Sequence, residues 1–119
     1  MAWLGNEVLD AALNYIDTNT ENLYICSTEP TTFTQASALS GASGYKLGTK
    51  AITTEISVSG DRGAGGREII ISTFSDGVVN ETGTAAFWAL TDDSASILLA
   101  TGALSASQLV TATNPFSFT

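Results

Sequence analysis

With 119 residues, the chain is the size of one domain, which leaves no room for a separate catalytic module. Its 12 acidic residues outnumber its four basic ones, and the formal charge of −8 argues against direct binding to nucleic acid or an anionic membrane, which select basic surfaces. Charged residues make up only 13% of the chain and hydrophobic ones 44%, a balance that favours a β protein over long solvated helices.

The N-terminal residues and the cysteine count indicate the compartment of synthesis. The opening residues MAWLGNEVLD contain no basic segment and no long apolar run, so no signal peptide is predicted. No stretch approaches the roughly 18 consecutive apolar residues that a membrane-spanning helix requires. Cys26 is the only cysteine, so no internal disulfide can form. We therefore expect the protein to be made and folded in a reducing cytoplasm.

The first predicted element is an amphipathic helix over residues 4–18. Asn6 is a suitable N-cap, and Glu7 and Asp10 fall in the early turns, where the helix dipole favours acidic residues. The residues DTNTEN then end the helix, because they prefer turns. Apolar residues recur at the spacing of one helix face, at Leu4, Val8, Leu9, Ala12, Leu13 and Ile16.

A short strand and a loop are predicted next. The segment NLYICST, residues 22–28, predicts a strand that carries Tyr24 and Cys26 on one face and is closed by Pro30. Residues 31–50 are rich in Ser, Thr and Gly and show little periodicity, which indicates a loop with one helical turn between Phe33 and Leu39.

From residue 51 to residue 119 the pattern is that of β structure. Strands are predicted in ITTEISVS (52–59), REIIISTF (67–74) and DGVVNETG (76–83), with the glycine-rich segment GDRGAGG between the first two. Short strands at this spacing predict a mainly β fold, either an antiparallel β-sandwich or a small barrel, in a single domain spanning residues 1–119. The N-terminal helix would cover one end or edge.

The segment GTAAFWALTDDSASILLATGALS, residues 83–105, predicts a hairpin that turns at Asp92, Asp93 and Ser94. Strict alternation would make both faces of each arm apolar, whereas antiparallel hairpins usually keep one polar face. The hairpin is therefore expected either to form the middle of a two-layer core or to have one face covered by another chain. Trp88 on the first arm and Leu99 on the second are the first candidates for such an interface.

The last predicted strand contains alternating Leu109, Thr111, Phe116 and Phe118 within SQLVTATNPFSFT. A terminal strand needs a neighbour, because an unpaired edge offers free N–H and C=O groups to other sheets. Phe116 and Phe118 are therefore further interface candidates.

Groups that carry out catalysis are scarce in this sequence. The absence of histidine removes the commonest general base and the usual partner of a nucleophilic Ser or Cys. Cys26 lies in an apolar strand and is interpreted as a small core residue. The adjacent Asp92 and Asp93 suit a hairpin turn, with a weak Ca²⁺ site as the alternative. We therefore predict that the protein is not an enzyme and has no catalytic residues, cofactor or metal.

Two further patterns in the sequence bear on binding. The segment GDRGAGGRE lacks the ending of a phosphate-binding loop and is not set between a strand and a helix. Arg62 and Arg67 supply half of the basic residues, so this loop is a candidate electrostatic contact with an acidic partner. Trp3, Phe87 and Trp88 could stack on a sugar or a base, but aromatics in apolar strands more often belong to a core or an interface.

The two ends of the chain resemble a group of small proteins of tailed bacteriophages. The resemblance lies in LDAALNYIDTNTENLYICSTEPTTFTQA near the N-terminus, and in the GTAAFWALTDDSASILLATGALS hairpin with its flanking residues; it is weak over residues 37–64. It implies a virion component, either a head decoration (cement) protein or a tail-associated accessory protein.

The resemblance and the residues together predict a structural virion protein made in the host cytoplasm. The leading expectation is a capsid decoration protein that bridges capsomers on the outside of the head and binds the major capsid protein or another virion protein. A homo-oligomer is expected, with a trimer first. The alternative is a tail- or fibre-associated module that binds a host surface. No contact with nucleic acid or membrane is expected.

Overall fold

Strands dominate a computed structural model of the chain, which describes residues 6–52, 56–59 and 68–118. The predicted mainly β, antiparallel fold with one N-terminal helix is confirmed. In chain order the elements are α1 (Asn6–Asn19), β1 (Asn22–Cys26), α2 (Phe33–Ser37), β2 (Lys46–Ala51), β3 (Ile56–Ser59), β4 (Glu68–Ile71), β5 (Phe74–Val79), β6 (Gly83–Asp92), β7 (Ile97–Val110) and β8 (Pro115–Phe118).

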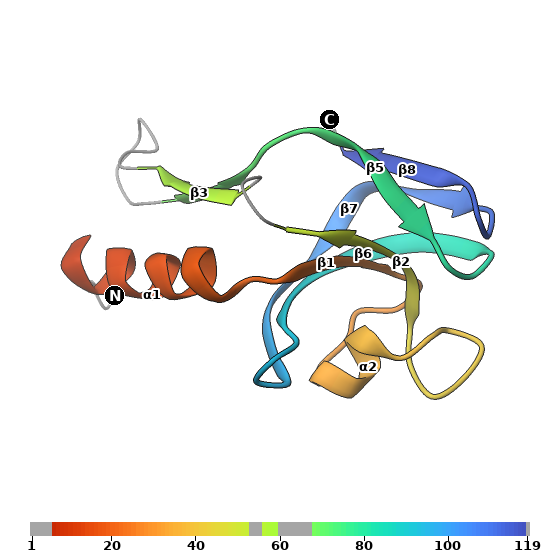
Figure 1. Ribbon diagram of the computed structural model, residues 1–119, viewed down its shortest axis with the longest axis horizontal. Coiled ribbons are helices and arrows are strands. Elements are labelled where there is room, and N and C mark those ends of the chain that lie inside the picture. The colour runs from red at the N-terminus through yellow and green to blue at the C-terminus, as the bar shows by residue number, and fades with distance from the viewer. Residues whose placement is uncertain (1–5, 53–55, 60–67, 119) are drawn as a thin grey trace.

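Six strands form one antiparallel sheet in the order β7-β6-β1-β2-β5-β8. The sheet curls into a half-barrel and does not close (Figure 1). Within the described residues, β7 pairs only with β6, and β8 pairs only with β5. Each end strand of the half-barrel therefore has one open edge.

The helix α1 lies with a small second sheet at one end of the molecule (Figure 1). This sheet is the β3–β4 hairpin, whose register pairs Ile56 with Ile71 and Val58 with Ile69. Asn6, expected as the N-cap, is the first residue of α1, and the helix ends where the main-chain N–H and the hydroxyl of Thr20 both donate to the carbonyl of Ile16. In the described part of the chain, no helix has the length and apolar character needed to cross a membrane.

The inner core fills the concave side of the half-barrel. It receives buried or partly buried side chains from all six strands of the large sheet and from α1, β3 and β4. This arrangement is expected where a curled sheet directs alternate side chains to its interior. The buried members are Leu23, Ile25, Leu47, Ile52, Ile56, Phe74, Ala85 and Leu90, and those packed against them are Ile16, Ile71, Trp88, Leu99, Ala100, Leu104, Val110 and Phe116.

The outer core lies on the other face of the sheet, under α2. It consists of Tyr24, Cys26, Ala36 and Ala89, with Tyr45, Phe87 and Leu98 packed around them. The predicted helical turn is confirmed as α2, whose N-cap Thr32 accepts a hydrogen bond from the main chain of Gln35 at 3.2 Å. Ala36 is fully buried, because α2 contacts β1, β2, β6 and β7.

These two cores explain why the β6–β7 hairpin has no polar, solvent-exposed face. On β6, Trp88 and Leu90 face the inner core, while Phe87 and Ala89 face the outer core. Of the two arrangements expected for the hairpin, the structure shows the middle of a two-layer core. Its apolar faces are largely covered by the chain itself.

Strict alternation along this hairpin is wrong at two points. The β6–β7 register shifts between Ala85 and Phe87 and again between Leu90 and Thr91. Such bulges insert extra residues and change which face a side chain joins. Leu99 and Ala100, adjacent in sequence, consequently both pack against the inner core.

The prediction of a loop over residues 31–50 is wrong at its end, because β2 occupies Lys46–Ala51. Several predicted strand boundaries also differ in the structure. The strand expected over residues 76–83 is β5 and begins at Phe74. The last predicted strand is divided, because residues up to Val110 extend β7 and β8 starts only at Pro115. The connection is closed by hydrogen bonds from Thr113 to the carbonyl of Val79 and from Asn114 to that of Thr111.

Candidate functional site

The predicted interface residues lie in three different settings. Trp88 and Leu99 are partly buried and pack against the inner core. Phe116 is also partly buried and meets Phe74 edge to face, with ring centroids 5.8 Å apart. Phe118 belongs to β8, but its side chain lies outside the described residues, as do Arg62 and Arg67.

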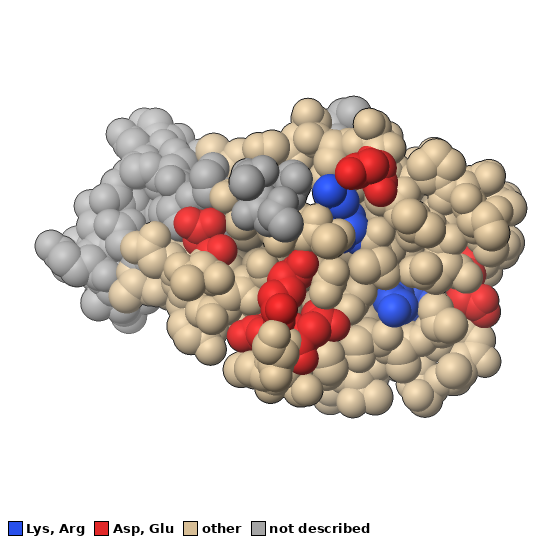
Figure 2. Space-filling view, in the orientation of Figure 1, with Lys and Arg blue, Asp and Glu red and all other residues tan. Residues whose placement is uncertain are grey.

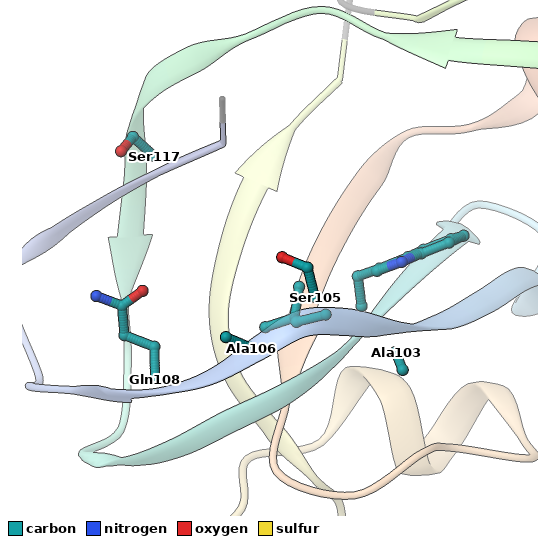
Figure 3. A pocket seen from close by; sticks show the side chains of 7 residues that line it. Ala103, Ser105, Ala106, Gln108 and Ser117 are labelled. Atoms are coloured by element: carbon teal, nitrogen blue, oxygen red, sulfur yellow. The ribbon is translucent and has the colours of Figure 1, made fainter.

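A cavity of about 350 Å³ opens between the two end strands of the half-barrel. Figure 3 shows Ser105 and Gln108 on β7 on the side that faces Ser117 on β8. A neighbouring cavity of about 220 Å³ shares Gln108 and Ser117 with it, so the two follow one opening, which we call the β7–β8 seam. The larger cavity is lined by Trp88, Ala103, Leu104, Ser105, Ala106, Gln108 and Ser117.

The seam arises where β7 departs from regular pairing. Gln108 pairs with Ala85 and Ala103 pairs with Phe87, so residues 104–107 of β7 stand opposite a single residue of β6. This bulge bends β7 away from the regular ladder. At the same place Trp88 lies across Gly102, where a Cβ atom would be 2.5 Å from the indole ring. The bulge and the glycine together position Trp88 at the cavity.

One residue of the sequence, Gly102, is a signal for this site. Glycine inside a strand often marks a bulge or a place where another group approaches the backbone closely. Gly102 lies in the second arm shortly before the bulge, and the Trp88 ring closely approaches its backbone. The position of the seam itself depends on which strands end the sheet, and no local pattern reports that.

The predicted hairpin turn at Asp92–Ser94 is confirmed, and hydrogen bonds join it to the acidic side chain of Glu21, which precedes β1. Glu21 accepts from the main chain and hydroxyl of Ser94 at 2.6 and 2.9 Å. These bonds, the backbone one first, lower the pKa of Glu21. The turn closes at Ser96, which has a positive φ of 57°. Among the described residues, no group of three or more His, Cys, Asp or Glu is placed to hold a metal ion.

Asp93 is the centre of this network. It accepts hydrogen bonds from the hydroxyls of Tyr24 and Thr91 and from the amide of Asn22. Partial burial raises the pKa of Asp93, but the hydrogen bonds from Thr91, Tyr24 and Asn22 favour the charged form, and the net pKa is lower than the ordinary 3.8. Burial, followed by the bond to Asp93, raises the pKa of Tyr24.

Cys26 is fully buried in the outer core, as the core interpretation predicted. Burial raises the pKa of its thiol to about 12, so the reactive thiolate is almost absent at neutral pH.

Both lysines of the chain interact with nearby acidic or aromatic side chains. Lys50 forms an ion pair with Asp76 at 3.0 Å, and its ammonium group lies 5.6 Å from the ring centroid of Phe74. The ammonium group of Lys46 lies 4.9 Å from the centre of the Tyr24 ring. In Figure 2 most of the visible surface is uncharged, with small separate acidic and basic areas. The described residues therefore provide no extended basic surface.

No known family model matches the chain, and comparisons with curated proteins and with solved structures also found no match.

Proposed function

We propose that the protein is a structural component of a tailed-bacteriophage virion, specifically a decoration protein that binds the outside of the head and stabilises the shell by bridging capsomers. Its partner would be the major capsid protein or another virion protein, and it would act as a homo-oligomer. The resemblance of the two ends of the chain to such proteins supports this, as does the low share of charged residues, 13%.

The observation that carries the proposal is the open edge of β7. All 14 residues of this strand, Ile97–Val110, are uncharged, and none is proline. Proteins that remain alone usually protect an edge strand with charges or proline. Leu109 on this strand is 72% exposed, the largest fraction among the exposed large hydrophobic residues of the described chain. An exposed leucine beside an uncharged edge is suited to contact with another protein.

The two register shifts in β7 limit how that contact would form. Bulges interrupt the regular array of N–H and C=O groups that a neighbouring strand would use. We therefore expect side chains such as Leu109, more than a long backbone ladder, to carry the contact. The exposed parts of Trp88 and Leu99 remain candidates, although both residues also stabilise the subunit.

Counting copies in purified particles tests the proposal. A decoration protein should be present in hundreds of copies, whereas a tail component should be present in a few to tens. Absence from the particles would contradict both virion roles. Particles that lack the protein should also be less resistant to heat, and adding purified protein should restore that resistance.

A pair of variants tests the proposed contact. Leu109→Ser should weaken binding to phage particles that lack this protein by about tenfold, since burying a leucine side chain contributes about 1.5–3 kcal/mol. Val78→Ser is the matched control, because Val78 is an exposed aliphatic residue of β5. Equal binding by both variants would exclude Leu109 from the contact. Unchanged unfolding curves would show that the subunit itself is intact.

A further inference from the structure

The β7–β8 seam is an open pocket beside the β7 edge; among the residues that line its larger part, Trp88 and Leu104 are partly buried and the others are exposed. Its larger part, of about 350 Å³, is within the size range of small-molecule sites. Ser105, Gln108 and Ser117 line it, and within the described residues none of their side chains makes a hydrogen bond to another side chain or to the main chain. Their donors and acceptors are thus available to a ligand.

The charge of the lining restricts what the cavity would bind. None of the described residues that line either cavity is charged, although the chain as a whole has a formal charge of −8. A charged ligand would lose its hydration there without gaining an ionic partner. A nucleotide or another anion would also be repelled by the acidic protein. The ligand should therefore be neutral.

The combination of side chains favours a polyhydroxylated ligand. Trp88 brings a partly buried indole to the cavity, held in place by its contact with Gly102. An indole offers a large apolar surface, and amide and hydroxyl groups around it can fix a polar ligand by hydrogen bonds. A sugar ring has this dual character, with apolar C–H groups on its faces and hydroxyl groups at its rim.

The shape of the seam argues against a peptide strand as the occupant. A strand that paired with β7 and β8 would have to pass through the opening from end to end. Residues 111–114 connect β7 directly to β8, so the two strands come together at that end of the seam. The opening is blocked there. It suits a compact ligand that enters from the other end or from the side.

From these observations we propose that the β7–β8 seam is a binding site for neutral carbohydrate. One sugar unit would occupy the larger cavity against Trp88, with hydrogen bonds to Ser105, Gln108 and Ser117. The adjoining cavity of about 220 Å³ would receive a second unit of a longer glycan. The smaller cavity includes Leu109, so a partner bound through the β7 edge would cover it, whereas the larger cavity does not contain Leu109 and can be tested separately from the proposed function.

Titration with defined sugars tests the site. The probes are glucose, galactose, N-acetylglucosamine and their disaccharides, added up to tens of millimolar and followed by saturation-transfer NMR. Intrinsic fluorescence of a Trp3→Phe variant gives a second readout, because Trp88 is then the only tryptophan. At least one neutral sugar should bind and change this fluorescence. A disaccharide that binds more tightly than its monosaccharide would identify the end of a glycan as the natural ligand, and equal affinity would identify a free sugar.

Two serines on the same strand provide a matched pair of variants. Ser105 lines the cavity, whereas Ser107 is exposed and lines neither cavity. Ser105→Ala and Gln108→Ala should each weaken sugar binding by about two- to tenfold, the effect of losing one hydrogen bond. Ser107→Ala should leave it unchanged. The proposal is overturned if no probe binds, if glucuronate binds as tightly as the neutral sugars, or if all three variants bind like the parent protein.

Discussion

At the scale of single residues, Asp93 is the best-connected polar group of the described chain. It lies in the turn after β6 and accepts hydrogen bonds from Asn22 and Tyr24 of β1 and from Thr91 of β6. A carboxylate that is bonded in this way fixes the tip of the hairpin to the neighbouring strand. Its value for stability can be measured by removing its donors one at a time.

Replacing Tyr24 with phenylalanine should lower the free energy of unfolding by about 1–2 kcal/mol, because the ring stays in place while the bond to Asp93 is lost. The measurement is urea denaturation, in which the dependence of the unfolding free energy on urea concentration should be the same for parent and variant. Tyr45→Phe is the control, since Tyr45 also packs against the outer core and no hydrogen bond of its hydroxyl is found among the described residues. Equal losses in both variants would show that the hydrogen bond contributes nothing specific.

Asp93→Asn should reduce stability at neutral pH and remove part of its pH dependence. The folded state lowers the pKa of Asp93 below 3.8, so folding favours the ionised carboxylate. The stabilisation is therefore present above this ordinary value and is lost as the pH falls through the folded-state pKa. The difference in unfolding free energy between parent and variant should shrink in acid. A difference that stays constant from neutral to strongly acidic pH would contradict this account.

The sequence predicted some of these residue roles and not others. The turn at Asp92–Ser94 and the burial of Cys26 follow from local composition, because turn formers and short apolar strands are recognisable in a few residues. The bond between Tyr24 and Asp93 joins residues 69 positions apart. It depends on β1 lying beside β6, and no local pattern specifies that pairing.

At the scale of elements, the β6–β7 hairpin decides the architecture. Its two apolar faces allow it to separate the inner core from the outer core, with α2 covering the second. The sequence indicated the hairpin, its turn and its unusual apolarity. It did not indicate the bulge that brings Leu99 to the same side as its neighbour Ala100, because this bulge arises from pairing with β6 and not from the alternation of β7 itself.

Gly102→Ala should destabilise the protein by about 1–3 kcal/mol through overpacking, since the added methyl group would collide with the Trp88 ring. Urea denaturation of Gly102→Ala, Trp88→Leu and the double variant forms a cycle that isolates this contact. The glycine substitution should cost much less once the indole is gone. Additive losses would mean that the strain arises in the backbone of β7 and not at Trp88.

At the scale of the whole molecule, the inner core holds the parts together. Side chains of α1, β3 and β4 reach the same cluster as the six strands of the large sheet. The mainly β class was predictable from short strands and turn residues. The half-barrel was not, because whether a curled sheet closes depends on the pairing of its end strands, which are 14 and four residues long here.

Light scattering after gel filtration should show a homo-oligomer of the 12.3 kDa chain, with the trimer expected from the sequence as the first candidate. The physical reason is the uncharged open edge of β7 with Leu109 beside it. Leu109→Ser should shift the distribution toward smaller species if that edge joins the copies. A single monomeric species at high concentration would exclude self-association as the role of this edge.

The alternating directions in the large sheet impose a parity rule on any addition to it. Five successive antiparallel pairings separate β7 from β8, so these two strands run in opposite directions. A single strand added between β7 and β8 would have to lie parallel to one of them. Only an even number of added strands, such as the two strands of a grafted hairpin, keeps every pairing in the closed sheet antiparallel. A closed antiparallel cylinder therefore requires either direct pairing of β7 with β8 or strands added in pairs.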